Sequence, residues 1–297
     1  MNEKYSRSKV LRLFLPLLSL MTCFVNAELL DRGDGLIYDS SLNITWAQDI
    51  QLAQTLGYNA SINDFSAGAN NGDDFLSYSE ALAFAAALNT HSFDGGNTLG
   101  YKGLTGWRLP QLNNFSAAQL LNSGFTSTNA AGTQNRGRGI TDRRQELSHL
   151  YNVSLGGEAS SAGAKGCQNN ANSGCIYSTA DLSLFTNTHV LNVSDAGLVA
   201  QGLSASLTTA ARDALTTFFY RQRALLVDGT PESNRAYSFV GRQGYQNDTA
   251  LNFGSLNGGG RAWVVHDGDI GGSGIREVPV RVVSFNVEAG NRSTPQA

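Results

Sequence analysis

The chain lacks the short motifs that identify the common nucleophilic, phosphate-binding and metal-dependent enzymes. It has no Gly-x-Ser-x-Gly nucleophile elbow, and its Gly-rich stretch at 157–165 lacks the Gly-Lys-Ser/Thr ending of a phosphate loop. Glu146 and His149 have the spacing of one half of a di-iron carboxylate site, but the second half is missing. The sequence therefore predicts no catalytic residue, and it favours a structural Glu146–His149 pair on one helix.

Long apolar runs are missing everywhere except at the N-terminus. There, four Lys or Arg residues precede an apolar stretch at 13–25, and Val25-Asn26-Ala27 places small residues at the −3 and −1 positions of a signal-peptidase site. The stretch is short for a membrane span, although an uncleaved anchor remains the alternative. Residues 1–27 are therefore predicted to be a signal peptide. The mature chain is expected to begin near Glu28, without a stable membrane span, and to be secreted, periplasmic or on the surface of a Gram-negative bacterium.

Basic residues are scarce, and lysines most of all. The leader holds four of the 21 basic and one of the 24 acidic residues, so 17 basic and 23 acidic side chains remain, with a net charge near −6. This balance argues against nucleic acid or an anionic membrane as a partner. Beyond the leader only Lys102 and Lys165 are lysines, and the other cations are arginines. Arginine suits bidentate pairing, so we expect internal Arg–carboxylate pairs.

Cysteine is almost absent beyond the leader. Cys167 and Cys175 bracket the turn-forming sequence Gln-Asn-Asn-Ala-Asn-Ser-Gly. In an exported chain this arrangement predicts a disulfide, which would contribute roughly 2–3 kcal/mol by closing a short loop. A metal pair is disfavoured because neither a Cys-x-x-Cys spacing nor a nearby histidine accompanies the two residues.

Alternation and capping signals predict an α+β fold with a twisted antiparallel sheet, several short helices and long loops. Apolar residues alternate on both sides of the turn formers at 39–43, which indicates a hairpin within residues 28–50. Ser77-Tyr78-Ser79-Glu80 is a capping box that begins a helix reaching about Asn89. Three further helices are expected, from Pro110 toward Leu121, from Asp142 through Tyr151, and from Leu207 to Tyr220.

The remaining segments are assigned by composition. Residues 122–140 are rich in Gly, Asn and Thr and are expected to form a loop. β-Rich runs predict strands at 225–227, 236–240, 261–265 and 278–283, and residues 288–297 are expected to be a flexible tail. With helices in the middle and strands at both ends, we expect one domain at 28–287 in which the N-terminal hairpin pairs with C-terminal strands.

Four motifs stand out in this pattern: Gly-Leu-Ile-Tyr-Asp at 35–39, Gly-Trp-Arg-Leu-Pro at 106–110, Glu-Leu-Ser-His-Leu-Tyr at 146–151 and Ala-Trp-Val-Val-His-Asp-Gly-Asp at 262–269. In these motifs the chain resembles the family named after the C-terminal domain of a Legionella collagen-like protein, over most of residues 33–270. The resemblance implies a single C-type-lectin-like domain. The segment from Tyr38 to Trp46 belongs to the same resemblance, and the residues expected to form a framework are Trp46, Trp107, Arg108, Pro110 and Trp263.

The resemblance also implies a function. The founding member of the family is an adhesin whose trimeric domain binds sulfated glycans, so an adhesin-like, non-enzymatic recognition of glycan or envelope material is the expected role, and a homo-oligomer stays open. The alternative is an enzyme, or an enzyme-like accessory protein, that acts on cell-envelope substrates. The three tryptophans could stack on sugars, but their places in the framework favour core packing.

Two groups of polar residues are candidate sites. Arg136, Arg138, Arg143 and Arg144 form the one cationic cluster, which could accept an anionic glycan or could be structural. Oxygen-rich turns contain Asp73 and Asp74 in one segment and Asp267 and Asp269 in another, and such side chains could hold Ca²⁺ as a cofactor. Solvated turns without a metal are the alternative interpretation of these aspartates.

Overall fold

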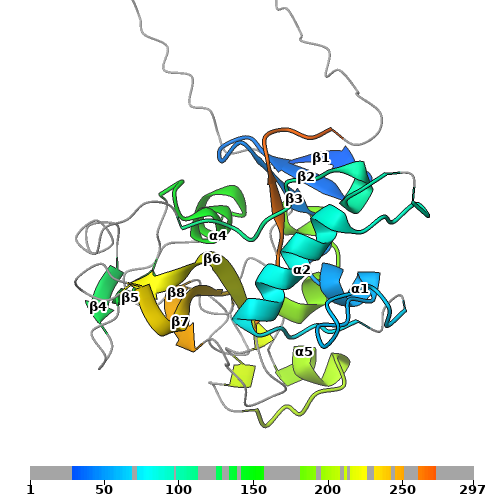
Figure 1. Ribbon diagram of the computed structural model, residues 1–297. Helices are drawn as coiled ribbons and strands as arrows, with labels where there is room; N and C mark the ends of the chain where they lie inside the picture. The colour runs from blue at the N-terminus through cyan, green and yellow to red at the C-terminus, as the bar shows by residue number, and fades with distance from the viewer. Residues whose placement is uncertain are drawn as a thin grey trace, which may run out of the picture.

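The computed structural model describes residues 29–68, 72–96, 98–112, 125–128, 134–138, 142–156, 181–191, 195–207, 211–212, 215–225, 231–241, 245–250 and 260–271. These residues form antiparallel sheets, one long helix and several short helices, as the predicted α+β class requires (Figure 1). The predicted signal peptide, the Cys167–Cys175 pair, the strand at 278–283 and the tail at 288–297 lie outside the described residues.

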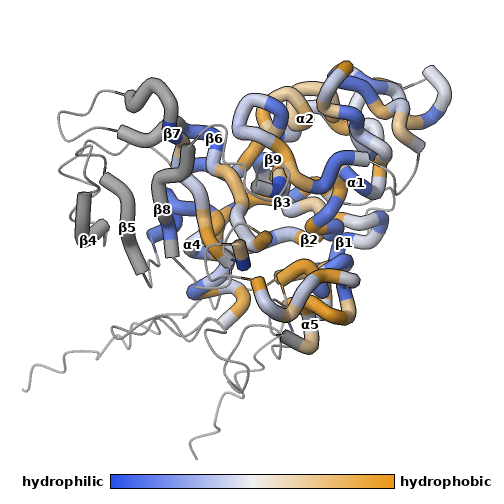
Figure 2. The backbone as a smooth tube through the Cα atoms, turned by 90° about the horizontal axis from the view of Figure 1, so that it is seen from below, coloured by the Kyte–Doolittle hydropathy of each residue, from blue (hydrophilic) through white to orange (hydrophobic). Residues whose placement is uncertain are grey.

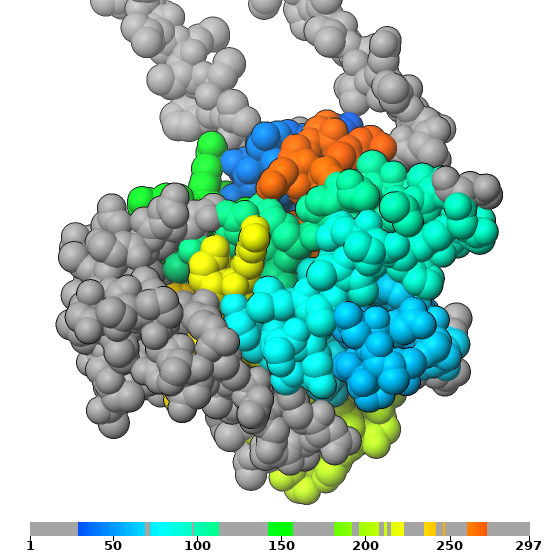
Figure 3. Space-filling model, viewed as in Figure 1, coloured from blue at the N-terminus to red at the C-terminus, as the bar shows by residue number. Residues whose placement is uncertain are grey.

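The first sheet joins the two ends of the described chain. Its strand order is β1 (Leu29–Gly33), β2 (Leu36–Asp39), β3 (Ile44–Ala47) and β9 (Val265–Asp267). β2 pairs with β3 and β3 pairs with β9, so both the predicted hairpin and its pairing with a C-terminal strand are confirmed. The C-terminal strand begins at Val265, where the strand expected at 261–265 was to end. Figure 3 shows residues of the first three strands (blue) beside those of the last one (orange).

The second sheet has the order β4 (Phe125–Thr128), β5 (Gln134–Arg138), β8 (Tyr245–Ala250), β7 (Pro231–Val240) and β6 (Thr217–Leu225). The loop predicted over residues 122–140 is therefore wrong, since this segment contains β4 and β5. Their composition is that of turns, but β4 pairs with β5 and β5 pairs with β8. Backbone pairing with a distant strand has here overridden a weak local preference.

β6 corrects a second prediction, because its first residues were expected to end a helix at Tyr220. Phe218 and Tyr220 belong to one apolar core, and Phe219 between them belongs to another. Successive side chains of a strand point to opposite faces, so an extended backbone buries all three aromatic rings at once. Before the strand, residues 211–212 and 215 are helical.

The long helix α2 (Tyr78–Thr90) was predicted correctly. Ser77 accepts the backbone N–H of Glu80, and the Glu80 carboxylate accepts the backbone N–H of Ser77, so the capping box is formed. The described residues also contain short helices: α1 (Leu52–Leu56), η1 (Tyr101–Gly103), α4 (Glu146–His149), η2 (Leu150–Ser154), η4 (Asp181–Leu184), η5 (Thr188–Leu191) and α5 (Asp195–Ala200). Among the described helices, none has the length and apolar character needed to cross a membrane.

Two expected helix starts are wrong. Pro110 is not in a helix, and Leu112 instead forms a bridge with Gln145, while the rest of the segment expected to be helical lies outside the described residues. Asp142 does not cap the next helix, which begins at Glu146. Asp142 instead forms a turn: its carbonyl oxygen accepts the backbone N–H of Gln145, and its carboxylate accepts that of Arg144. α4 continues directly into the π-helix η2, so the predicted helix exists with a shorter α-helical part.

Two apolar cores lie on the two sides of β6. One contains Trp46 and Trp263, whose ring centroids are 5.3 Å apart, and the other contains Trp107 under α2. All three tryptophans are buried, which agrees with their interpretation as core residues. Figure 2 shows apolar positions along α2 and along β2 and β3. Arg108 lies beside these cores and carries the polar contacts described next, and the carbonyl oxygen of Pro110 accepts the backbone N–H of Arg221 at 2.8 Å.

Candidate functional site

Three of the four motifs meet at a polar junction centred on Arg108. Its guanidinium binds both carboxylate oxygens of Glu146, each at 2.8 Å, and its Nη2 lies 2.5 Å from Oδ1 of Asp267. Glu146 also accepts the backbone N–H of Gln111 at 2.6 Å. The side chains of Arg108 and Glu146 are only 10% and 7% exposed. The junction thus connects the second, third and fourth motifs.

Electrostatics show how tightly this junction is coupled. Desolvation by burial lowers the pKa of Arg108, but the hydrogen bonds to Glu146 and Asp267 outweigh it, so the net shift is upward. The hydrogen bond from Arg108 lowers the pKa of Asp267. Arg108 and Asp267 are therefore held in their charged forms, and with Glu146 they form an ion network that fixes the framework.

A second buried cluster connects the first motif to the third. Asp39 is fully buried; its Oδ1 accepts the backbone N–H and the hydroxyl of Ser41 at 3.0 and 2.6 Å, and its Oδ2 accepts the hydroxyl of Ser154 at 2.6 Å. His149 Nε2 lies 2.9 Å from the Ser41 hydroxyl oxygen. His149 thus contacts Ser41 and Glu146 binds Arg108, so each of the two residues contacts a distant segment of the chain.

This cluster resembles a serine–histidine pair, but its geometry does not activate the serine. The single proton of the Ser41 hydroxyl goes to Asp39, so Nε2 of His149 acts as the donor toward Ser41. A nucleophilic serine needs a histidine that accepts its proton. Ser41 is also only 6% exposed, so a substrate cannot reach it. The arrangement is a hydrogen-bonded lock between the β2–β3 turn and the third motif.

His266 completes the contact between the second and fourth motifs. Its ring nitrogens lie 2.7 Å from the carbonyl oxygen of Asp267 and 2.8 Å from that of Thr105. Gly106, at φ +107°, faces the ring, and a Cβ there would lie 3.0 Å from Nε2. The glycine of the second motif is therefore required both by its backbone conformation and by the imidazole beside it.

An open pocket lies beside this framework, at the loop that follows α2. Its volume is about 720 Å³, within the range of small-molecule sites. The lining residues are Leu56, Phe93, Asp94, Thr98, Gly100, Tyr101, Lys102 and Gly103. Figure 3 shows this part of the chain (cyan to green) at the molecular surface.

One wall of the pocket is aromatic. Phe93 packs edge-on against Tyr101 with ring centroids 5.7 Å apart, and Tyr101 packs in the same way on Trp107. The Trp107 indole donates to the carbonyl of Tyr101 at 3.1 Å, and its ring contacts His266. Burial raises the pKa of Tyr101 to about 12, so its hydroxyl stays protonated well above neutral pH.

The backbone of the pocket loop is held by its own hydrogen bonds. Asp94 accepts the Ser92 hydroxyl at 2.8 Å and the backbone N–H of Thr98 at 3.0 Å, and Gly100 donates to the carbonyl of His91 at 2.9 Å. A Cβ at Gly100 would lie 2.0 Å from the carbonyl oxygen of Leu104, so this position requires glycine. These contacts preorganise the wall of the pocket.

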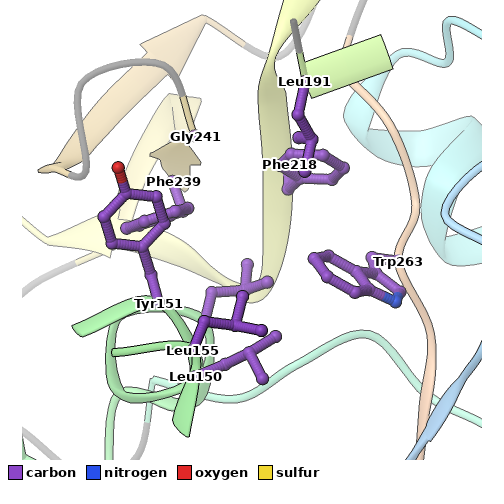
Figure 4. A pocket seen from close by; sticks show the side chains of 9 residues that line it. Leu150, Tyr151, Leu155, Leu191, Phe218, Phe239, Gly241 and Trp263 are labelled. Atoms are coloured by element: carbon purple, nitrogen blue, oxygen red, sulfur yellow. The ribbon is translucent and has the colours of Figure 1, made fainter. Parts of the chain in front are cut away.

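A separate apolar cavity lies inside the core, between η2 and β6 (Figure 4). Its volume is about 10 Å³, which is room for about one water molecule. Leucine and aromatic side chains line it, together with Gly241. A site without several polar partners does not retain water, so this cavity is a packing defect and not a ligand site.

The cationic cluster predicted from sequence is divided between two elements. Arg136 and Arg138 lie on β5, a strand and not the expected loop, whereas Arg143 and Arg144 are exposed in the turn before α4. Arg144 binds the Asp142 carboxylate at 2.6 Å, which lowers the pKa of Asp142. Part of the positive charge is thus neutralised locally.

The aspartates predicted as calcium ligands all have protein partners. Asp73 accepts the backbone N–H of Ala60 at 2.8 Å, and Asp74 binds Arg261 at 2.7 Å. Asp267 binds Arg108, and Asp269 binds Arg32. In the part of the chain that the structure describes, no three His, Cys, Asp or Glu side chains come together as a metal site. Asp74, Asp267 and Asp269 instead fulfil the expectation of internal arginine pairs.

Sequence reasoning missed the pocket residues Phe93, Tyr101 and Lys102. The signals that could have indicated them are weak: Lys102 is one of two lysines after residue 27, and Gly100 and Gly103 lie near it as turn residues. No protein-family model, no curated protein and no solved structure matches the chain. The geometry of the pocket therefore carries the functional argument alone.

Proposed function

We propose that this chain is an exported, non-enzymatic binding domain with a C-type-lectin-like fold, and that the pocket at the loop after α2 binds sugar residues of glycan or envelope material. The observation that carries the proposal is the open pocket of about 720 Å³ with the half-buried Phe93 beside polar groups. Sugars combine apolar C–H faces with hydroxyls, so they suit an aromatic surface next to hydrogen-bonding side chains.

The arrangement of the chain supports a lectin-like domain. The N-terminal strand β3 pairs with β9, so the two ends of the domain meet in one sheet. The pocket loop follows the C-terminal end of α2. The residues of the four motifs mainly contact one another, through Arg108, Asp39 and His266, so the motifs hold the framework together. The alternative of an envelope enzyme gains no support here, because among the described residues Ser41 and His149 form a lock and not an active pair.

A glycan array probed with the purified chain tests the proposal. The wild-type chain should bind a restricted set of sugars, and Phe93→Ala should weaken that binding about tenfold by removing the aromatic contact. Ile62→Ala is the matched control, because Ile62 is an exposed apolar residue that does not line the pocket. Equal binding by Phe93→Ala and wild type would place the sugar site elsewhere.

Export is tested separately. Intact-mass analysis of protein recovered from the periplasm or medium should give a chain that begins at Glu28. Peptide mapping without reduction should link Cys167 to Cys175. Full-length protein held in the inner membrane would contradict the signal peptide, and free thiols at both cysteines would contradict the disulfide.

A further inference from the structure

Lys102 stands out in the pocket because its charge is not neutralised by the protein. Its side chain is exposed, and its ammonium lies 5.5 Å from the centre of the Tyr101 ring. Among the residues that the structure describes, no carboxylate lies within ion-pair distance of Lys102, which is the one cation among the described residues that line the pocket. The pocket therefore presents a cation that is available to a ligand.

The backbone at Lys102 gives an independent observation. Its φ is +57°, a left-handed conformation that costs energy for a residue with a side chain. Gly100 and Gly103, on either side, have φ values of +92° and +71°. Glycine at position 102 would adopt the same backbone without strain. The conformation holds the ammonium against the aromatic wall of the pocket.

The surrounding charge limits the kind of anion that fits. Asp94 lines the same pocket, Asp49 acts on Tyr101 electrostatically, and the chain beyond the leader is acidic overall. A densely charged polyanion would meet repulsion from these carboxylates, whereas one anionic group needs only one ammonium. The Lys102 site thus matches a ligand with a single negative charge per recognised unit.

We propose that the pocket selects a sugar with one carboxylate, a uronic acid, whose carboxylate binds the Lys102 ammonium while its ring lies against Phe93. This inference rests on the proposed sugar-binding function and adds the chemical class of the ligand. Charge-assisted hydrogen bonds are about twice as strong as neutral ones, so the carboxylate supplies selectivity over the parent sugar. Added salt weakens the contact because the ammonium is exposed.

The test uses matched sugars on the full chain. Methyl glycosides of glucuronic and galacturonic acid are titrated beside the parent hexosides and their 6-sulfates, followed by ligand-observed NMR. Wild type should bind a uronide about tenfold more tightly than the parent hexoside. Lys102→Gln should remove this preference and Lys102→Arg should keep it. Lys165→Gln, which changes the net charge equally, should behave as wild type.

The possible outcomes distinguish failure of the uronic-acid assignment from failure of the proposed sugar binding. If the hexosides bind but the uronides bind no better, or if Lys102→Gln keeps the preference, the pocket binds sugars and the carboxylate assignment is wrong. Tighter binding of the 6-sulfates than of the uronides would assign a sulfated ligand and also overturn it. If none of these sugars binds and the glycan array is blank, the proposed function fails and this inference fails with it.

Discussion

Arg108 and Glu146 form a buried, bidentate ion pair that connects the second and third motifs across 38 positions of the sequence. Both side chains are almost inaccessible, and Asp267 of the fourth motif binds the same guanidinium. Breaking one partner of such a pair leaves a buried charge without compensation, which costs more than the pair itself contributes.

Arg108→Met should therefore destabilise the protein by about 3–5 kcal/mol, measured by denaturant unfolding. Arg144→Met is the matched control, because Arg144 binds Asp142 at the surface, where an ion pair contributes about 0–1 kcal/mol. Similar losses in the two variants would show that Arg108 does not hold the framework together.

Asp267 gives the junction a pH dependence with a defined sign. The hydrogen bond from Arg108 lowers the pKa of Asp267 below its value in the unfolded chain, about 3.9. The stabilising contribution is thus fully present above the unfolded pKa and is lost as the pH falls through the folded pKa. Asp267→Asn should make the unfolding free energy decline less steeply between about pH 5 and pH 2. An unchanged decline would contradict the coupling.

Gly106 is predicted to be irreplaceable for two reasons that can be separated. Gly106→Ala adds strain at φ +107° and places a Cβ 3.0 Å from Nε2 of His266, for a loss of about 2–3 kcal/mol. Gly268→Ala carries only the strain, because at φ +80° its Cβ would meet nothing within 4 Å, so it should cost about 1 kcal/mol. Combining Gly106→Ala with His266→Ala should recover the steric part, as unfolding of the double variant would show.

Local signals made part of this fold predictable. The hairpin around Asp39 and the start of α2 at Ser77 depend on neighbours within a few residues, so the turn formers and the capping box were sufficient. β6 could not be predicted this way. Leu215 and Phe218 fit a helical period, but two cores lie on opposite faces of the segment, and only the tertiary structure supplies them.

The candidate sites show the same division. Scarce lysines and abundant arginines predicted internal Arg–carboxylate pairs, and Arg32, Arg108 and Arg261 have them. Which carboxylate pairs with which arginine depends on contacts over as many as 237 positions of sequence, so Asp269 could be interpreted as a calcium ligand. The pocket was missed because its wall depends on how the loop after α2 folds back on Trp107.

Arg136 and Arg138, which lie on β5, are the candidate site from the sequence that competes with the pocket. In Figure 1 β5 and the loop after α2 lie on opposite sides of the molecule. Arg136→Ala combined with Arg138→Ala should therefore leave sugar binding unchanged, while replacement in a strand should lower stability by about 0.5 kcal/mol. Titration of the double variant with the uronides checks this. A steep loss of affinity with an unchanged melting temperature would move the ligand site to β5.

Gly241 allows the apolar cavity of Figure 4 to be filled without changing the surface. A Cβ there would lie 3.4 Å from Leu191 Cδ2, Phe218 Cε2 and the carbonyl oxygen of Thr216, at the near limit of ordinary contact. Gly241→Ala should stabilise the protein by about 0.5–1 kcal/mol, because it buries a methyl group and reduces the freedom of the unfolded chain.

Gly260→Ala is the matched control for the cavity, since both glycines lie beside β6. The added Cβ at position 260 would lie 2.9 Å from the carbonyl oxygen of Thr217 and 3.0 Å from the Phe219 ring, so this variant should be destabilised. The two variants should change the free energy of unfolding in opposite directions. Both restrict the unfolded chain equally, and only the room for the added methyl group differs. If Gly241→Ala also destabilises, the cavity is too small to accept a methyl group, and the core at Phe218 is packed as tightly as the backbone at Thr217.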